Sequence, residues 1–373
     1  MTLPDDAAFR SPLLGLPGAV TADAPDLGVA GHYGDPIREQ RRIADGGADG
    51  DGWVDLSHRD VVRIEGQDRL SWLHNLTTQR LDKLEAGMGT EALILSPQGR
   101  VEHHLQLVDD GDAIWIHLEP GGAASLVAFL DSMRFMLRVD VADVTAEWAV
   151  VWQLSNEPHP SYLARVDPQA ANTPSDAVAG RQLFVPRDQL TAFASAAIDR
   201  GEAPAGVLAL EALRIEAGRP RFGVDTDDRT IPHEMGWIGG AVQLNKGCYR
   251  GQETVAHVAN LGRPPRRLIR LHLDGSVRES LPAAGTAIQS DGVTIGRLTS
   301  SAYHYELGPI ALGVVKYATA DDVEVSVGSA EPTATSTGSA EPVAARIESI
   351  VERDDSPRPG QAARAAFGRK SLL

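Results

Sequence analysis

The sequence predicts an α+β protein that ends in a small all-β domain. Helix-like and strand-like segments alternate through the first two thirds of the chain without a long parallel run, which favours an α+β layer over a doubly wound sheet. After Pro264-Pro265 the pattern changes to short strands separated by turn residues, as in a small barrel or sandwich. A length of 373 residues exceeds what one hydrophobic core usually serves, so we expect two or three domains.

The expected division follows these changes in composition. A repeated Gly-Ser-Ala-Glu-Pro inside the all-β part indicates a disordered insertion, and the basic C-terminal end indicates a flexible tail. The expected parts are a discontinuous α+β domain at 1–52 and 147–262, a second α+β domain at 53–146, a β-barrel at 264–353 with its insertion at 328–342, and a tail at 354–373.

Hydrophobic periodicity predicts the elements of the α+β part. Leu70, Leu73 and Leu76 recur at helical spacing, whereas Leu105 and Leu107 alternate with polar neighbours as in a strand. The predicted strands are two within 53–64, a hairpin of 91–95 with 99–108, 113–118 and 147–154. The predicted helices are 67–76, 121–135, 189–200 and 207–217, with a polar connection at 155–180 and a long irregular loop at 219–245.

The all-β part contains six predicted strands. They combine β-branched and other apolar residues with Gly, Pro, Ser and Asp between them. These strands are 268–273, 286–289, 294–299, 310–315, 323–327 and 343–351.

The only cysteine of the chain lies in the stretch Lys246-Gly247-Cys248-Tyr249-Arg250-Gly251-Gln252-Glu253. A helix is predicted over 252–260, so Lys246 and the helix N-terminus would both stabilise a thiolate at Cys248. The two glycines allow a tight turn or a close approach to a ligand. A buried structural cysteine is the competing interpretation, and these residues alone support the two equally.

The octamer K-G-C-Y-x-G-Q-E resembles the YgfZ family of folate-binding proteins, which are implicated in maintaining iron–sulfur enzymes and in tRNA modification. That family is similar in fold to the glycine-cleavage T-protein, an aminomethyltransferase, and the resemblance runs from about residue 31 to about residue 350. It implies a T-protein-like α+β fold with a C-terminal β-barrel and bound tetrahydrofolate or a one-carbon derivative. Candidate catalytic residues are Cys248 and Lys246, and candidate folate contacts in the octamer are Tyr249, Gly251, Gln252 and Glu253.

Further candidates for folate binding lie outside the octamer. The stretch Arg214-Ile215-Glu216 resembles the family's R-x-E-x-G segment, in which a glutamate contacts the pterin, so the resemblance implies that role for Glu216 beside Arg214. Glu234 lies in a P-x-E segment and is a weaker candidate. Arg266 and Arg267 suit the carboxylates of a folate tail. The alternatives are a surface carboxylate at 216 paired with Arg214 or Arg219, and interdomain salt bridges at 266 and 267.

Two histidines mark a departure from the T-protein. The stretch Gly99 to Leu105 corresponds to a segment of the T-protein that contains a pair of aspartates, one of which is held essential for aminomethyl transfer. In this chain His103 and His104 stand in that register. Adjacent strand residues point to opposite faces, so these histidines cannot ligate one ion unaided. We expect no metal site and doubt classical glycine-cleavage activity.

Composition excludes several functions. A formal net charge of −16 argues against a protein that binds the phosphate backbone of nucleic acids over a broad surface, so any effect on tRNA would be indirect. No basic leader and no run of 18 apolar residues occur, and one cysteine cannot form an internal disulfide, so we expect a cytoplasmic protein that binds no membrane. No dinucleotide fingerprint, P-loop or serine nucleophile elbow is present.

Three functional hypotheses remain. The first is a tetrahydrofolate-binding protein that supports assembly or repair of iron–sulfur enzymes, with client proteins or assembly factors as partners. The second is a folate-dependent aminomethyl- or methyltransferase, in which His103 or His104 would have to supply the acid or base. The third is a non-catalytic folate-sensing adaptor in which Cys248 is merely packed.

Overall fold

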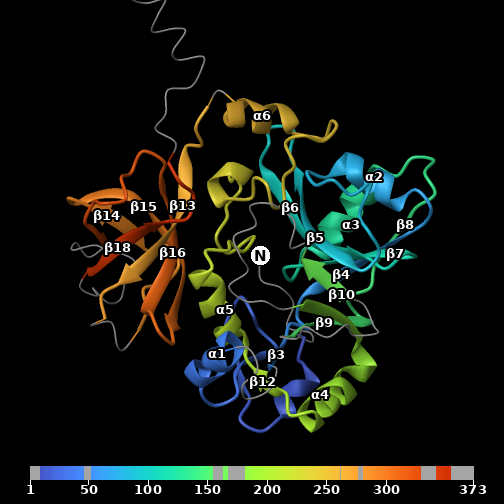
Figure 1. Ribbon diagram of the computed structural model, residues 1–373, viewed down its shortest axis with the longest axis horizontal. Coiled ribbons are helices and arrows are strands. Elements are labelled where there is room, and N and C mark those ends of the chain that lie inside the picture. Colours follow the sequence, from blue (N-terminus) through green and yellow to red (C-terminus); the bar gives the residue numbers. More distant parts are fainter. Residues whose placement is uncertain are drawn as a thin grey trace, which may run out of the picture.

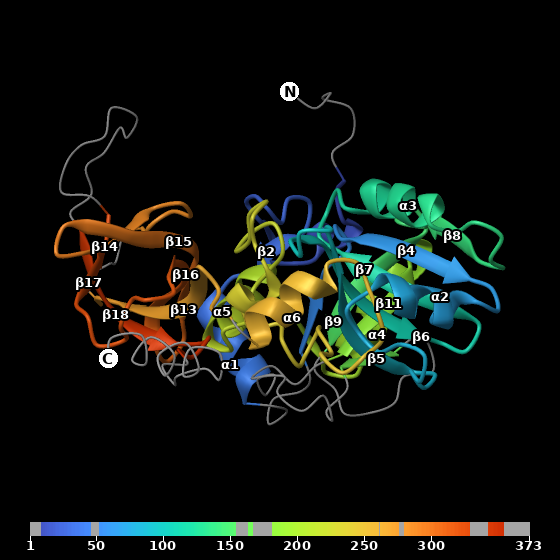
Figure 2. The same cartoon turned by 90° about the horizontal axis from the view of Figure 1, so that it is seen from above.

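The computed structural model describes residues 9–45, 52–153, 163–166, 181–260, 262–275, 280–328 and 342–353. The predicted tail and all but the end residues of the predicted insertion lie outside these ranges. Figure 1 shows a β-barrel on one side, a large sheet on the other, and helices between and around them. Seen from above, the barrel and the β4–β8 edge of the sheet occupy opposite ends of the molecule (Figure 2).

One ten-stranded sheet forms the α+β part, in the order β12-β3-β9-β11-β10-β5-β6-β7-β4-β8. Most neighbours are antiparallel, but β10 pairs with β5 in parallel and so joins two halves of the sheet. Its strands are β3 (Gly52–Asp55), β4 (Asp60–Glu65), β5 (Met88–Leu95), β6 (Val101–Asp109), β7 (Ala113–Leu118), β8 (Asp140–Asp143), β9 (Trp148–Gln153), β10 (Leu163–Val166), β11 (Arg181–Pro186) and β12 (Ala203–Ala205).

Helices cover the sheet on both faces because each has one apolar face. The helices α2 (Arg69–Leu76) and α3 (Ala123–Ser132) pack Leu73 and Leu126 against β5, β6 and β7, and α4 (Leu190–Asp199) packs on β9 and β11 beside η2 (Arg187–Gln189). The helices α1 (Pro36–Ala44) and α5 (Val207–Glu216) lie against each other. Burial of these faces contributes the main favourable free energy of the fold.

The N-terminal segment adds η1 (Pro12–Gly15) and a small hairpin of β1 (Val20–Thr21) with β2 (Ala30–His32), none of which the sequence predicted. Strand β10 is also an unpredicted element, because its polar, Pro-rich surroundings indicated a connection, and β8, β11 and β12 were not predicted either. All the helices and strands that the sequence predicted are present, with ends shifted by a few residues. The predicted irregular loop 219–245 contains only η3 (Pro232–Met235) and one isolated bridge.

The C-terminal part is a closed six-stranded barrel, as the strand pattern predicted. Its order is β13-β16-β15-β14-β17-β18. Its strands are β13 (Arg266–Leu273), β14 (Ala287–Ser290), β15 (Val293–His304), β16 (Gly308–Lys316), β17 (Val325–Val327) and β18 (Val343–Ser349). Because the barrel is closed, each of these six described strands pairs with a neighbour on both sides.

The octamer loop and α6 (Gln252–Asn260) connect the sheet to the barrel (Figure 1). Tyr249 and Val255 share one hydrophobic cluster with Leu95 of β5, Ile215 of α5 and Leu312 of the barrel. This cluster joins the sheet, the helix and the barrel into one packed body. Among the described residues no helix is both long and apolar enough to cross a lipid bilayer.

Candidate functional site

Lys246 begins the octamer and is buried, with 6% of its surface exposed. Its ammonium group donates hydrogen bonds to the carbonyl oxygens of His74 and Thr77 at the C-terminal end of α2. It also lies 5.1 Å from the ring centre of Tyr249. Burial lowers the pKa of Lys246 to about 8. The charge of Lys246 therefore caps α2.

The middle of the octamer is fixed by packing. The Tyr249 side chain lies in the hydrophobic cluster with a buried hydroxyl, and burial raises its pKa to about 12. Gly251 has a φ of +81°, and a Cβ there would come within 2.5 Å of the carbonyl oxygen of Ser96 in the β5–β6 turn. Only glycine fits this conformation and this contact. Tyr249 and Gly251 thus anchor the loop, and their folate-binding role stays a prediction.

Cys248 lies between the buried residues Lys246 and Tyr249 and is exposed as a free thiol. Next to it, Arg250 forms an ion pair with Glu102 of β6 at 3.0 Å. Gln252 donates a long hydrogen bond of 3.4 Å to the Lys246 carbonyl, and Glu253 is exposed in the first turn of α6. The thiol therefore projects from a loop whose neighbouring side chains are held, and it is accessible to a reagent or partner.

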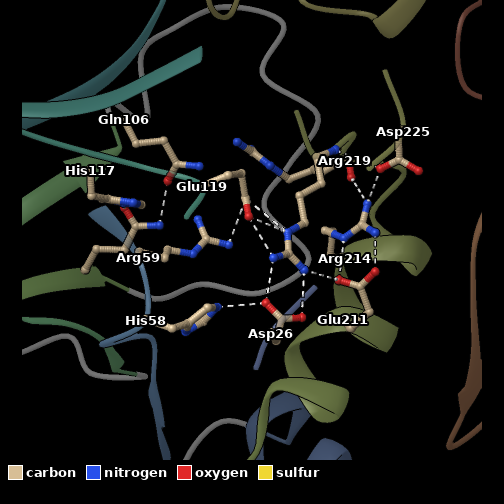
Figure 3. Close-up of polar contacts among 12 residues, drawn as sticks. Asp26, His58, Arg59, Gln106, His117, Glu119, Glu211, Arg214, Arg219 and Asp225 are labelled. Atoms are coloured by element: carbon tan, nitrogen blue, oxygen red, sulfur yellow. Dashed lines mark hydrogen bonds and ion pairs between the residues drawn. The ribbon is translucent and has the colours of Figure 1, made fainter. Parts of the chain in front are cut away.

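A central ion cluster, defined as Asp26, His58, Arg59, Glu119 and Arg221, lies where the N-terminal segment meets the sheet (Figure 3). Arg221 donates to both Asp26 oxygens at 2.6 and 2.9 Å and to Glu119 at 2.7 Å. His58 binds Asp26 at 2.8 Å, and Arg59 pairs with Glu119 at 3.1 Å. Charges buried this deeply are stable only because they are paired.

The cluster keeps its acids ionised. Burial alone would raise the pKa of Glu119, but Arg59 and Arg221 outweigh that effect and hold it at about 2. Burial is likewise outweighed at Asp26, where hydrogen bonds from His58 and Arg221 lower the pKa. The carboxylates therefore carry fixed negative charge at neutral pH and are unsuited to act as general acids.

A second set of pairs continues the network toward α5. Arg214 binds Glu211 and, at 2.7 Å, Asp225, and it also donates to Ser300 of the barrel at 2.8 Å. Arg219 pairs with Glu91 of β5. Arg214 is thus enclosed by partners from the protein itself, so a contact with folate stays a prediction.

The other predicted folate contacts also have partners within the protein. Glu216 is the last residue of α5, one residue before the predicted end of that helix, and its carboxylate lies 3.2 Å from His304 of β15. The alternative partners Arg214 and Arg219 bind other carboxylates, Glu211 and Asp225 in one case and Glu91 in the other. Glu234 is fully buried, and Arg266 binds both it and Asp227. The Glu216 side chain is 31% exposed, which leaves it accessible.

Arg267 lies inside the barrel and has no exposed surface. It donates to Ser349 and to the carbonyl oxygen of Thr319, each at 2.8 Å, and it pairs with Asp321. Contact with a folate tail would require these bonds to break. The interdomain alternative fits Arg266, whose partners belong to the loop before the octamer, whereas Arg267 stabilises the barrel.

His103 and His104 lie on opposite faces of β6, as strand geometry predicted. His103 contacts the ring of Phe129 on α3, whereas His104 packs against Trp237 and binds Glu91 at 3.0 Å. Burial lowers the pKa of each imidazole to about 4, so both are neutral at pH 7. No three metal-ligating side chains gather within the described ranges.

Sequence reasoning did not single out the central ion cluster. Its members come from the β1–β2 segment, the β3–β4 turn, the end of β7 and the loop after α5, and no local pattern relates them. One signal was available at Arg219-Pro220-Arg221, because two arginines directly after a helix that ends in Arg214 and Glu216 concentrate charge in one place.

Comparisons with known proteins agree on the fold. No family model matches the chain. A chloroplastic protein of Arabidopsis thaliana, provisionally named a transferase, is 28% identical over 269 residues, which cover 66% of this chain and 61% of that protein, so the match spans less than two thirds of that relative. An aminomethyltransferase of Thermus thermophilus is 25% identical over 304 residues, covering 75% of this chain and 84% of that enzyme.

A solved structure gives the same result in three dimensions. The glycine cleavage system aminomethyltransferase T from Bartonella henselae superposes with a TM-score of 0.72 at 18% identity, and the match covers 90% of this chain and 94% of that one. The mixed α+β sheet and the closed barrel therefore form the aminomethyltransferase T-protein fold.

Proposed function

We propose that this protein binds tetrahydrofolate or a one-carbon derivative and supports the assembly or repair of iron–sulfur enzymes, so that it affects tRNA methylthiolation indirectly. One observation carries the proposal: within a T-protein fold, Cys248 is exposed on a loop whose neighbours Lys246, Tyr249 and Gly251 are anchored. A thiol held in this way is suited to act on a thiol or an iron–sulfur cluster of a partner protein. One thiolate is far short of the ligand set of a stable cluster, so client proteins or assembly factors would supply the rest.

The proposed folate position centres on Glu216. Its accessible carboxylate would accept paired hydrogen bonds from a ring N–H and the exocyclic amine of the pterin. In the register that the family resemblance implies, His103 and His104 replace the aspartate pair of the T-protein, and their imidazoles are neutral at pH 7. This supports a role other than classical aminomethyl transfer. Fixed charges in the central ion cluster would keep the surrounding elements in place around the ligand.

Complementation tests the function. In a bacterial strain that lacks its own YgfZ-type protein, we expect the unaltered chain to restore methylthiolated tRNA, measured by mass spectrometry of nucleosides, and Cys248→Ala to fail. Arg250→Gln serves as the matched control, since it changes the same loop but leaves the thiol in place. Restoration by Cys248→Ala would show that the thiol is structural, and failure of the unaltered chain would contradict the proposed role.

The pocket has a separate test. Calorimetric titration with tetrahydrofolate should show binding by the unaltered protein and at least tenfold weaker binding by Glu216→Ala, since both pterin hydrogen bonds would be lost. Glu65→Gln, an exposed carboxylate on β4, is the control. Equal affinity of Glu216→Ala and the unaltered protein would contradict the placement of the pterin.

A second candidate is a folate-dependent aminomethyltransferase. It is favoured by the relative of that name in Thermus thermophilus, which aligns over 75% of this chain. Tetrahydrofolate-dependent release of ammonia from an aminomethyl donor would support it. The absence of such release from a protein that binds tetrahydrofolate would leave the first proposal in place.

A further inference from the structure

The barrel holds the C-terminal end of α5 at two points. The guanidinium group of Arg270 on β13 donates to the backbone carbonyl oxygen of Glu216. The Nε2 atom of His304 on β15 lies 3.2 Å from the Glu216 carboxylate. The His304 side chain has no exposed surface, whereas the carboxylate remains accessible. A buried residue of the barrel thus reaches the residue to which we assign pterin binding.

Hydrogen bonds determine how the His304 ring is oriented. Its Nδ1 atom accepts from the backbone N–H groups of Glu306 at 3.2 Å and Leu307 at 3.1 Å. Because Nδ1 is an acceptor, Nε2 is the nitrogen that carries the hydrogen and donates to Glu216. The ring also packs on Tyr305, with 4.5 Å between ring centres. The imidazole therefore presents one donor in one direction.

The turn that carries His304 is held by α1. Gln40 is buried and donates to the Tyr303 carbonyl oxygen at 2.9 Å, while its own oxygen accepts from the Tyr305 N–H at 2.9 Å. These two bonds bracket His304 in the chain. The imidazole cannot move away from Glu216 unless the bonds from Gln40 or those of the turn are broken.

We infer that His304 is a positioning residue for the folate site, through which the barrel orients the Glu216 carboxylate toward the pterin. The inference rests on the proposed folate-binding role of Glu216. A carboxylate offers about four lone-pair sites, so one bond from His304 leaves the acceptors that the two pterin donors need. Fixing the carboxylate before binding removes an ordering cost from the binding step. His304 itself need not touch the ligand.

The test compares tetrahydrofolate affinities by calorimetry. His304→Phe keeps a ring against Tyr305 but has no donor, and we expect its dissociation constant to rise about tenfold. His304→Gln retains an N–H donor near the position of Nε2, so we expect it to recover most of the affinity. His272→Phe is the matched control, because His272 of β13 binds Glu348 at 2.6 Å in the same barrel.

The outcomes separate the two proposals. Affinity that is unchanged in His304→Phe, or lost equally in His304→Phe and His304→Gln, would overturn the positioning role. If His304→Phe does not fold, Gln40→Leu provides the second test, with a threefold to tenfold loss of affinity expected and no loss contradicting the inference. An unaltered protein that does not bind tetrahydrofolate would instead overturn the proposed function, and a Glu216→Ala variant that binds it fully would overturn the placement of the pterin on which the positioning role rests.

Discussion

At the scale of single residues, burial changes what the octamer's charges do. From the sequence, Lys246 is a neighbour that could stabilise a Cys248 thiolate. In the structure its ammonium group is directed to the carbonyl oxygens of His74 and Thr77, while the thiol is exposed. A cation that is bonded to the end of one helix is less available to a second group.

Replacing Lys246 tests this division of roles. We expect Lys246→Met to lower the free energy of unfolding by about 1–3 kcal/mol, because the α2 carbonyl groups lose their donor. The rate at which iodoacetamide alkylates Cys248 in the native protein should change less than twofold. Arg250→Met, which removes a half-exposed ion pair with Glu102 and a guanidinium contact with the Phe129 ring, is the control in urea unfolding. A large fall in the alkylation rate at unchanged stability would instead assign Lys246 to the thiol.

At the scale of elements, the octamer loop and the β5–β6 hairpin fit together through two glycines. Gly99 has a φ of +76°, and a Cβ there would come within 2.7 Å of Thr254 on α6. Gly251 approaches Ser96 in the same way from the other side. Close contact between the two turns, rather than a ligand, explains why glycine is required at 251.

Alanine substitutions distinguish this contact from a general effect on the loop. Gly251→Ala should lower the free energy of unfolding by about 2–4 kcal/mol, since it combines a strained positive φ with a clash against backbone. Gly247→Ala lies four residues earlier, where a Cβ meets nothing within 4 Å, and we expect a change below about 1 kcal/mol. Urea unfolding followed by circular dichroism measures both, and equal effects would contradict the assigned contact.

At the scale of the whole molecule, the central ion cluster connects segments that are distant in sequence. Arg221 follows α5, Asp26 precedes β2 and Glu119 follows β7, yet their charged groups form one chain of contacts (Figure 3). Removing one partner would leave a buried charge uncompensated, which costs more than a surface pair. The cluster therefore couples the N-terminal segment to the sheet.

The cluster predicts how stability depends on pH. Glu119 has an ordinary value of 4.5 and is held at about 2 in the folded protein, so its contribution is present above pH 4.5 and lost as the pH falls toward 2. The expected loss from this group is about 3 kcal/mol. We expect the free energy of unfolding, measured with denaturant at pH 6, 4 and 3, to fall less steeply with decreasing pH in Glu119→Gln than in the unaltered protein. Asp140→Asn, exposed at the sheet edge, is the control. The same pH dependence of the free energy of unfolding in Glu119→Gln and in the unaltered protein would contradict the prediction.

Sequence alone determined much of the architecture, because periodicity and turn residues are local properties. The helix at 252–260, the strand at 113–118 and all six barrel strands were found within a few residues. The octamer led to the T-protein fold that the solved structure supports. Strands β8, β10, β11 and β12 and the β1–β2 hairpin were missed, since short strands in polar or Gly-rich surroundings depend on their partners and not on their own residues.

Only the tertiary structure decided which groups meet. It paired Glu216 with His304, Arg266 with Glu234, and Arg221 with Asp26, across separations of 32 to 195 residues. It also enclosed Arg267 in the barrel and exposed Cys248. Residue spacing fixes which face of a helix or strand a side chain lies on, but the burial and the partner of a charge depend on how distant elements pack, and these set its energy and its chemistry.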